Sequence, residues 1–378
     1  MECTLAPASE APNSVHWGCI GCGSVCEVKS LPALYKTRNS SVIALCRRDQ
    51  EALRSFQERH HLESATLHSS PEDLIARLLQ FKADHPLKQV GVYISTPVST
   101  HAPLAKLSIA AGLITYLEKP AARSAAESLE VLEVLKNAPS PPPVFVAYYR
   151  RCLPKFVAVK QALAALGTVS SVSVTLFQKR HLMDPAGKGH WHFAKETSGG
   201  GLLLDLGSHT MDLLDFLLGP IRGASGVAAR VNAGSPGGED VEDVVVGSWL
   251  HAGGGGGVVP GSATFNFAAS HDLDQTVIVG SKGTVRFGVF DNIPATLTTA
   301  EGAVWTQERS LGFKHLGGVP EHVQGPLVEK IVGVLVEGKE RGEDVSTLES
   351  AQRTGEVLDK LLNGRGGWEE DYVLPKAE

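Results

Sequence analysis

The sequence lacks the features of a nucleic-acid-binding, membrane or secreted protein. It has no run rich in lysine and arginine, and 35 basic against 41 acidic residues give a formal net charge of −6. This balance argues against a nucleic-acid or membrane-surface partner. No segment approaches the ~18 uninterrupted apolar residues of a membrane-spanning helix, and no basic stretch followed by an apolar one opens the chain. We therefore expect a soluble, cytoplasmic protein.

Cysteine is also scarce, with six residues in 378, which is too few for a secreted disulfide framework. Three of them stand in "GCIGCGSVC" (18–26), with the spacing Cys19-x2-Cys22-x3-Cys26. A metal site would need a fourth ligand and a loop. The alternative is that these are small residues packed around a glycine turn. Because a helix over Ser24–Leu34 would separate Cys22 from Cys26, we favour packing and expect no metal.

The length of 378 residues, 43% of them hydrophobic, predicts two domains after a flexible tail over 1–13. Residues 14–147 alternate strands with helices, which is typical of an α/β domain with a parallel sheet covered on both faces. Ser70 before Pro71 marks one helix start. Residues 148–378 contain longer alternating strands and one dominant helix, and predict an α+β domain with a large, open, mostly antiparallel sheet.

The glycines of the 18–26 segment have a clear use. Gly21-x-Gly23 lies between a predicted strand and a predicted helix whose first two residues are Ser24 and Val25. Glycine there permits a tight turn and lets backbone N–H groups approach a pyrophosphate at the positive end of the helix. Cys26 takes the place of the third small residue of this pattern. The segment predicts a dinucleotide site.

The end of the second predicted strand bears on which nucleotide is bound. An acidic residue there would bind the ribose hydroxyls, but this strand ends in Cys46-Arg47-Arg48. Two guanidinium groups suit a 2′-phosphate, so we favour NADP(H) and leave NAD(H) open. The alternative is that Arg47 and Arg48 are two solvated loop residues.

Two segments place polar groups where a doubly wound sheet opens its ligand crevice. "STPVSTH" (95–101) follows the third long strand, and "EKP" (118–120) ends the next one. Lys119 in that tripeptide is placed to donate or accept a proton. The alternative is a surface lysine at a strand end.

The dominant helix of the second half carries an acid and an imidazole. Asp205 and His209 are four residues apart in "GGGLLLDLGSHTMD" (199–212), so an α-helix would present both on one face. The alternative is an ordinary acid and a buried core histidine. His190 and His192 lie nearby in the sequence, but without a convincing third ligand we expect no metal.

Together these motifs resemble the glucose–fructose oxidoreductase/inositol dehydrogenase (Gfo/Idh/MocA) family, in order along nearly the whole chain. The matching segments are "WGCIGCGSV", "VYISTPVSTHAPLAKLSIAAG", "EKP", "YYRRCLPKF", "GGGLLLDLGSHTMDLLDFLLG" and "IVGSKGTVRF".

The resemblance implies a Rossmann domain, a doubly wound parallel sheet, followed by an α+β domain often used for dimerisation, hence a homo-oligomer formed through the second sheet. It makes Lys119 the catalytic lysine and Asp205 and His209 the substrate-site pair. It implies that the Lys119–Pro120 bond is cis. It also assigns coenzyme contacts to Thr96, Pro97, His101, Glu118 and Lys119. The other expected coenzyme-binding residues are Gly21, Gly23, Ser24, Val25, Arg47 and Arg48. His192 stands where many members carry arginine.

The implied activity is reversible hydride transfer between NADP(H) and a secondary alcohol or ketone of a sugar, cyclitol or trans-dihydrodiol. In this interpretation His209 hydrogen-bonds the reacting oxygen and Lys119 completes the proton relay. Asp205 orients these two side chains. Two alternatives stay open: a non-catalytic nucleotide-binding sensor of the same fold, and a reductase of an imine or bilin.

Overall fold

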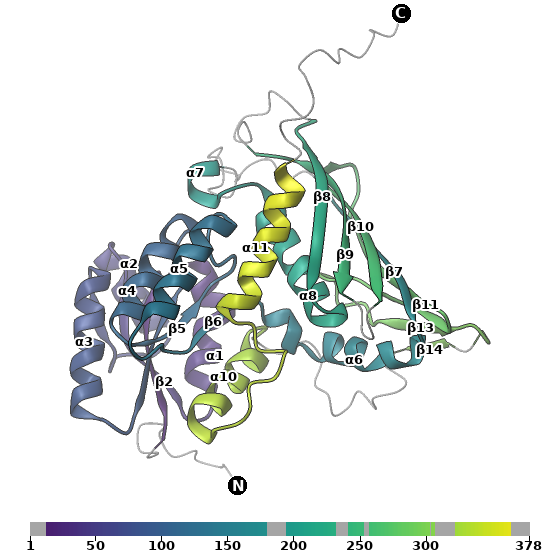
Figure 1. Cartoon of the computed structure of the whole chain (residues 1–378). Coiled ribbons are helices and arrows are strands. Elements are labelled where there is room, and N and C mark those ends of the chain that lie inside the picture. Colours follow the sequence, from purple (N-terminus) through teal and green to yellow (C-terminus); the bar gives the residue numbers. More distant parts are fainter. Residues whose placement is uncertain are drawn as a thin grey trace, which may run out of the picture. The chain divides into compact units, whose positions relative to one another are not determined.

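The computed structural model describes residues 13–179, 194–231, 241–252, 257–302, 304–306 and 322–363. They divide into two compact units (Figure 1). The first takes in the described residues as far as Val157 and those from 322 to Gln352, and the second takes in the remainder. The first unit is therefore built from two separate stretches of the chain.

The first unit contains a six-stranded sheet in the order β3-β2-β1-β4-β5-β6, in which all neighbours run parallel. Its strands are β1 Val15–Ile20, β2 Ser40–Cys46, β3 Thr66–His68, β4 Gln89–Ile94, β5 Ile114–Leu117 and β6 Val144–Val146. This is the strand order of a doubly wound nucleotide-binding fold, and it confirms the prediction of a parallel sheet.

Alternate side chains of these strands enter two separate cores, one on each face of the sheet. On β1, Trp17 and Cys19 enter the core built with α1 Leu31–Lys36, α2 Gln50–Arg59 and α10 Gly325–Glu337. Ile20 enters the other, built with α3 Pro71–Asp84, α4 His101–Ala110 and α5 Ala125–Asn137. Helix α3 begins as predicted, since Ser70 Oγ accepts a hydrogen bond from the N–H of Asp73 and Pro71 is the first helical residue.

The second unit contains an eight-stranded sheet in the order β14-β13-β12-β11-β7-β10-β9-β8. Its strands are β7 Val169–Lys179, β8 Ile221–Ala229, β9 Val244–Ala252, β10 Val258–Ala269, β11 Leu273–Gly280, β12 Gly283–Phe287, β13 Thr296–Thr299 and β14 Val304–Thr306. Among the strand pairs of the described residues in this sheet, β10 and β7 alone run parallel. The prediction of a mostly antiparallel sheet is confirmed.

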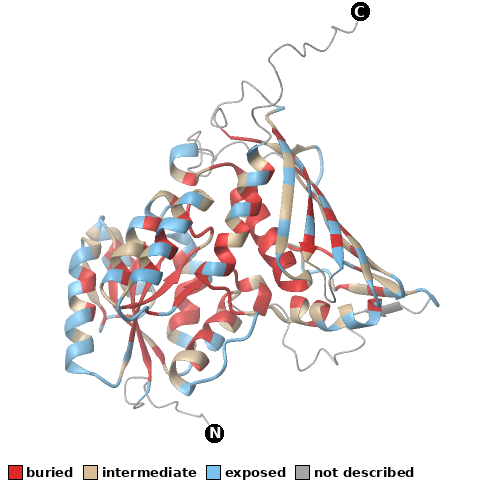
Figure 2. Cartoon of the chain, in the orientation of Figure 1, coloured by how far each residue is buried: buried red, intermediate tan, exposed pale blue. Residues whose placement is uncertain are grey.

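Among the described residues, helices pack on one face of this sheet, and the opposite face, which we call the open face, carries exposed side chains. Buried and exposed residues alternate along β9 (Figure 2). Helix α8 Ser208–Leu218 packs on β9, and Leu361 of α11 Leu348–Leu362 meets Gly226 and Gly247. The other α-helices of the described residues are α6 Pro154–Ala162 and the short α7 Lys195–Ser198. No helix within the described residues is long and apolar enough to span a membrane.

Candidate functional site

The glycine turn that follows β1 is pressed against the segment that follows β4. Gly21 has φ +92°, and a Cβ there would lie 2.7 Å from the carbonyl carbon of Ser95 and from Cγ2 of Thr96. Ser95 Oγ donates to the carbonyl of Gly21 at 2.6 Å. Only glycine fits this position, because both the backbone angle and the lack of space exclude a side chain.

The next residues of the turn are open to solvent. A Cβ on Gly23 would meet nothing within 4 Å, and Gly23, Ser24 and Val25 are exposed. The chain enters a helix here, first through a π turn over Cys26–Ser30 and then through α1. Pro32, which has no N–H and would crowd the carbonyl four residues before it in a regular helix, stands two residues after this wide turn. The exposed helix start fits a pyrophosphate group.

The three cysteines of this segment lie in the core beneath the turn. Cys19, Cys22 and Cys26 are buried, and Cys22 Sγ donates to the carbonyl of Cys19 at 3.8 Å. A hydrogen bond with Cys22, together with burial, raises the pKa of the Cys26 thiol. The expectation that a helix separates Cys22 from Cys26 is thus wrong, because both side chains turn inward. Among the described residues, no three histidine, cysteine or acidic side chains are grouped to hold a metal.

The two arginines after β2 have different surroundings. Arg47 is half-buried, and its Nη1 donates to the carbonyl of Cys22 at 3.1 Å, which ties the end of β2 to the glycine turn. Arg48 is exposed. The carboxylate of Asp49 accepts the N–H of Ala52 at 2.9 Å and so caps α2. Arg47 therefore lies against the glycine turn, and Arg48 is exposed at the end of β2.

His101 joins the segment after β4 to the segment after β5. Its ring is buried, with Nδ1 2.8 Å from the carbonyl of Pro120 and Nε2 2.9 Å from the carbonyl of Thr96. Burial lowers the pKa of His101, although both carbonyls act in the opposite direction. The side chain thus ties "STPVSTH", including Pro97, to "EKP" at the carboxyl end of the sheet.

Lys119 follows a buried carboxylate. Glu118 Oε1 accepts from the Tyr93 hydroxyl at 2.8 Å and from Gln324 Nε2 at 2.6 Å. Glu118 Oε2 accepts the backbone N–H of Lys119 at 3.2 Å. Lys119 is half-buried, and the Lys119–Pro120 bond is cis, as predicted. Gln324 was missed because no local signal links a single glutamine to a motif some two hundred positions earlier.

In the second unit, Asp205 and His209 lie on one continuous helical segment. A π turn spans Leu203–Gly207, in which the N–H of Ser208 bonds to the carbonyl of Leu203, and α8 follows. Asp205 is half-buried, His209 is buried, and the His209 ring meets Phe290 edge-on at 6.2 Å. The wider turn alters the α-helical spacing from which a common face was predicted.

The glycines before this helix pack on a buried acid that the sequence analysis did not single out. The N–H of Gly201 donates to Glu242 Oε1 at 2.9 Å, and a Cβ on Gly201 would lie 2.7 Å from the Glu242 carbonyl oxygen. Glu242 thus fixes where the helix begins. The only feature of the sequence that marks Glu242 is its position just before a long apolar strand.

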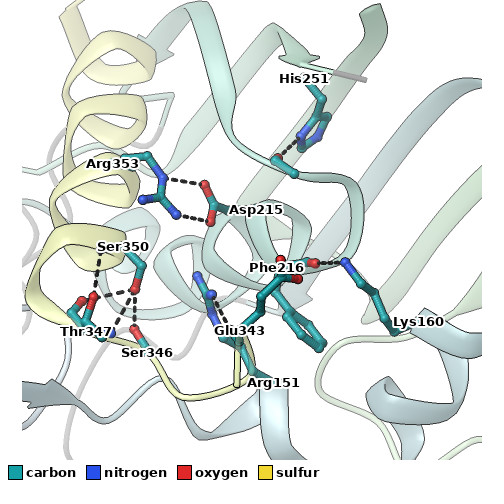
Figure 3. Close-up of polar contacts among 11 residues, drawn as sticks. Arg151, Lys160, Asp215, Phe216, His251, Glu343, Ser346, Thr347, Ser350 and Arg353 are labelled. Atoms are coloured by element: carbon teal, nitrogen blue, oxygen red, sulfur yellow. Dashed lines mark hydrogen bonds and ion pairs between the residues drawn. The ribbon is translucent and has the colours of Figure 1, made fainter. Parts of the chain in front are cut away.

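The other end of α8 is held by three side chains (Figure 3). Arg353 binds Asp215 through two hydrogen bonds, of 3.0 and 2.7 Å. Lys160 Nζ donates to the carbonyl of Phe216 at 2.5 Å, and His251 Nδ1 lies 2.8 Å from the carbonyl of Gly219. His209 is therefore carried by a helix fixed at both ends. His190 and His192 lie outside the described residues.

The strand order, the glycine turn and the exposed helix start define the first unit as a dinucleotide-binding Rossmann domain. A family model described as "Oxidoreductase family, NAD-binding Rossmann fold" matches residues 15–146. A second, described as "GFO/IDH/MocA C-terminal domain", matches residues 156–286. The chain belongs to the Gfo/Idh/MocA family of oxidoreductases.

Relatives of known sequence support this membership. "Oxidoreductase P35" of Formosa agariphila is 33% identical over 325 residues, which are 85% of this chain and 91% of that protein. Levoglucosan dehydrogenase of Pseudarthrobacter phenanthrenivorans is 27% identical over 217 residues, 52% of this chain and 54% of that one.

Solved structures share the fold. An oxidoreductase from Agrobacterium radiobacter in complex with NAD+, L-tartaric acid and magnesium is 20% identical, with a TM-score of 0.73 over 93% of this chain and 96% of that one. Aldose-aldose oxidoreductase from Caulobacter crescentus, complexed with glycerol, is 18% identical, with a TM-score of 0.75 over 93% and 97%. At this identity the likeness concerns the fold alone.

Proposed function

We propose that this oxidoreductase transfers a hydride between NADP(H) and a secondary alcohol or ketone carbon of a polyhydroxylated small molecule, namely a sugar, a cyclitol or a trans-dihydrodiol. The observation that carries the proposal is the placement of Lys119, which His101 and Glu118 hold at the edge of the sheet where the glycine turn lies. The names of the levoglucosan and aldose relatives support the substrate class.

The residues of the first unit fit a nicotinamide dinucleotide. Gly21 leaves no space for a side chain, whereas Gly23, Ser24 and Val25 offer an open cradle for the pyrophosphate. When bound, the coenzyme supplies or accepts the hydride. Thr96, Pro97, His101 and Glu118 would border its nicotinamide end, and Arg47 and Arg48 a 2′-phosphate.

Three side chains are proposed to handle the substrate. Lys119 donates or takes up the proton of the reacting oxygen and favours its developing negative charge. His209 hydrogen-bonds the same oxygen, and Asp205 orients the substrate through a neighbouring hydroxyl. Their polarity suits vicinal hydroxyl groups better than an imine or a bilin.

The coenzyme preference is tested by fluorescence titration with NADPH and with NADH. We expect NADPH to bind at least about tenfold more tightly, because each charge-assisted arginine–phosphate contact contributes about 1.5–3 kcal/mol. Arg48→Ala should remove most of the difference. Arg54→Ala, an exposed arginine on α2, is the matched control. Equal affinities in the unaltered protein would contradict the NADP(H) assignment, and binding of neither nucleotide would overturn the proposed function.

The role of Lys119 is tested by Lys119→Ala in a screen with levoglucosan, inositol and a trans-dihydrodiol. Turnover should fall by ~10²–10⁴-fold, the usual contribution of a general acid or base, while NADPH affinity stays within about threefold. Lys136→Ala, at an exposed lysine, is the control. Unchanged turnover would remove Lys119 from the mechanism. Tight coenzyme binding without turnover on any polyol would favour the sensor alternative.

We also propose that the second sheet joins two copies of the chain. Its open face carries exposed apolar side chains on three adjacent strands, and singly exposed apolar residues do not ordinarily gather in this way. They are Val227 (40%), Val246 (49%), Leu250 (45%) and Val258 (64%). The described cysteines form no disulfide with one another, which supports the proposed cytoplasmic location.

A further inference from the structure

A group of buried hydrogen bonds surrounds Glu118, the residue directly before the proposed catalytic lysine. Glu118 is 6% exposed, and both of its carboxylate oxygens accept hydrogen bonds from the protein. Oε1 accepts from Tyr93 and from Gln324, and Oε2 accepts from the backbone N–H of Lys119. A buried carboxylate is tolerated only when it is satisfied in this way.

The donors to Glu118 are themselves fixed. The Tyr116 hydroxyl donates to Gln324 Oε1 at 2.6 Å, which orients the side-chain amide so that its nitrogen faces the carboxylate. The Tyr93 hydroxyl lies 2.5 Å from Ser30 Oγ, and the rings of Tyr93 and Tyr116 are 5.1 Å apart. Burial raises the pKa of both tyrosines, so each keeps its proton and remains a donor.

These residues come from parts of the chain that meet only in the folded unit. Ser30 ends the π turn that follows the glycine turn, Tyr93 lies on β4, and Gln324 directly precedes α10. The hydrogen bonds therefore connect the helix that would bind the pyrophosphate to the backbone of Lys119. Apolar side chains of similar size would have filled the same space without the cost of burying a charge.

We propose that Tyr93 and Gln324 are positioning residues, which fix the Glu118 carboxylate and through it the backbone of Lys119, so that the ammonium group keeps one orientation toward the reacting oxygen. Tyr93 and Gln324 then act on the reaction through Glu118 and Lys119, and neither needs a contact of its own with the coenzyme. This inference rests on the proposed function of Lys119.

The first test measures the reactivity of Lys119 directly and needs no substrate. Methyl acetimidate modifies lysine amines, and mass spectrometry of the digested protein gives the rate at Lys119 across the neutral and alkaline pH range. In Tyr93→Phe and in Gln324→Met, we expect this rate to change by roughly three- to tenfold, as for the loss of one hydrogen bond, and its pH profile to move. The rates at exposed Lys29 and Lys136 should stay the same.

The control is Tyr35→Phe, which removes a hydroxyl of the same unit that contacts His60 and not Glu118. It should leave the Lys119 profile unchanged. The proposal would be overturned if the Lys119 profiles of Tyr93→Phe and Gln324→Met were identical to that of the unaltered protein. Should Gln324→Met fail to fold, the isosteric Tyr93→Phe decides the result alone.

Steady-state kinetics with an accepted polyol separate positioning from coenzyme binding. We expect kcat to fall roughly tenfold in both variants while KM and the NADPH dissociation constant stay within about twofold. A loss of NADPH affinity equal to the loss of kcat would instead show that Tyr93 and Gln324 act through coenzyme binding, and would overturn the inference. Failure of the proposed function looks different, since Lys119→Ala would then retain its turnover whatever the labelling shows.

Discussion

Among single residues, His16 on β1 makes the folding of the first unit depend on pH. Its ring is buried between the hydroxyls of Ser14 and Ser41, at 2.9 and 2.8 Å. Burial, with the nearby charges of Lys88 and His85, lowers its pKa from 6.5 to about 4. The native protein therefore holds this imidazole neutral under conditions in which the unfolded chain protonates it.

The sign of the effect follows from linkage. Between about pH 6.5 and 4 the unfolded chain binds the extra proton, so stability is full above this window and falls as the pH decreases through it. The loss should reach about 3 kcal/mol. Urea unfolding near both limits measures it, and His16→Asn should show a smaller difference between the two pH values. If the variant lost as much stability between the two pH values as the unaltered protein, other groups would be the cause of the loss.

At the scale of elements, the Asp215–Arg353 pair connects α8 to α11. The Asp215 side chain is 5% exposed and that of Arg353 is 38% exposed. Arg353→Met leaves a buried carboxylate without its cation, which should cost about 2 kcal/mol of unfolding free energy, less than for a fully buried pair because solvent reaches the arginine.

The matched control for this prediction is Arg59→Met, which breaks the more exposed pair with Glu27. Its cost should stay below about 1 kcal/mol. Denaturant unfolding of the two variants gives the comparison. Equal losses would mean that burial of Asp215 adds nothing to the strength of its ion pair.

Elements whose signals are local could be predicted from the sequence. The glycine turn after β1 and the Ser70–Pro71 helix start depend on neighbouring residues only, and both are where the sequence placed them. The two π turns, at Cys26–Ser30 and Leu203–Gly207, could not be predicted, because an amphipathic pattern cannot distinguish one widened turn from a regular helix.

Contacts across long sequence separations could not be predicted either. Motif residues of the candidate site, such as Lys119 and His101, could be singled out from the sequence, whereas Gln324 and Glu242 could not. Gln324 and Glu242 act through single hydrogen bonds to Glu118 and to the backbone of Gly201. A lone buried polar residue has no pattern of its own until the fold brings its partner to it.

At the scale of the whole molecule, the open face of the second sheet leads to the remaining prediction. Burial of Val227, Val246, Leu250 and Val258 against a second copy should make the protein a dimer or a larger homo-oligomer. Sedimentation equilibrium measures the mass, and Val246→Lys with Leu250→Lys should shift it toward the monomer. A monomeric mass for the unaltered protein at all concentrations would contradict the prediction.

The returning segment of the first unit has a consequence for how the protein is made. Leu327 and Val328 of α10 complete one core beside β1, and Leu348 and Ala351 of α11 complete the other. After Val157 has emerged from the ribosome, roughly 200 further residues must be synthesised before Gln352 emerges. Their synthesis takes roughly 10–40 s. During that time both faces of the parallel sheet lack part of their cover. The nascent chain therefore exposes the most apolar core surface to a chaperone after its amino-terminal half has emerged and before α10 and α11 follow.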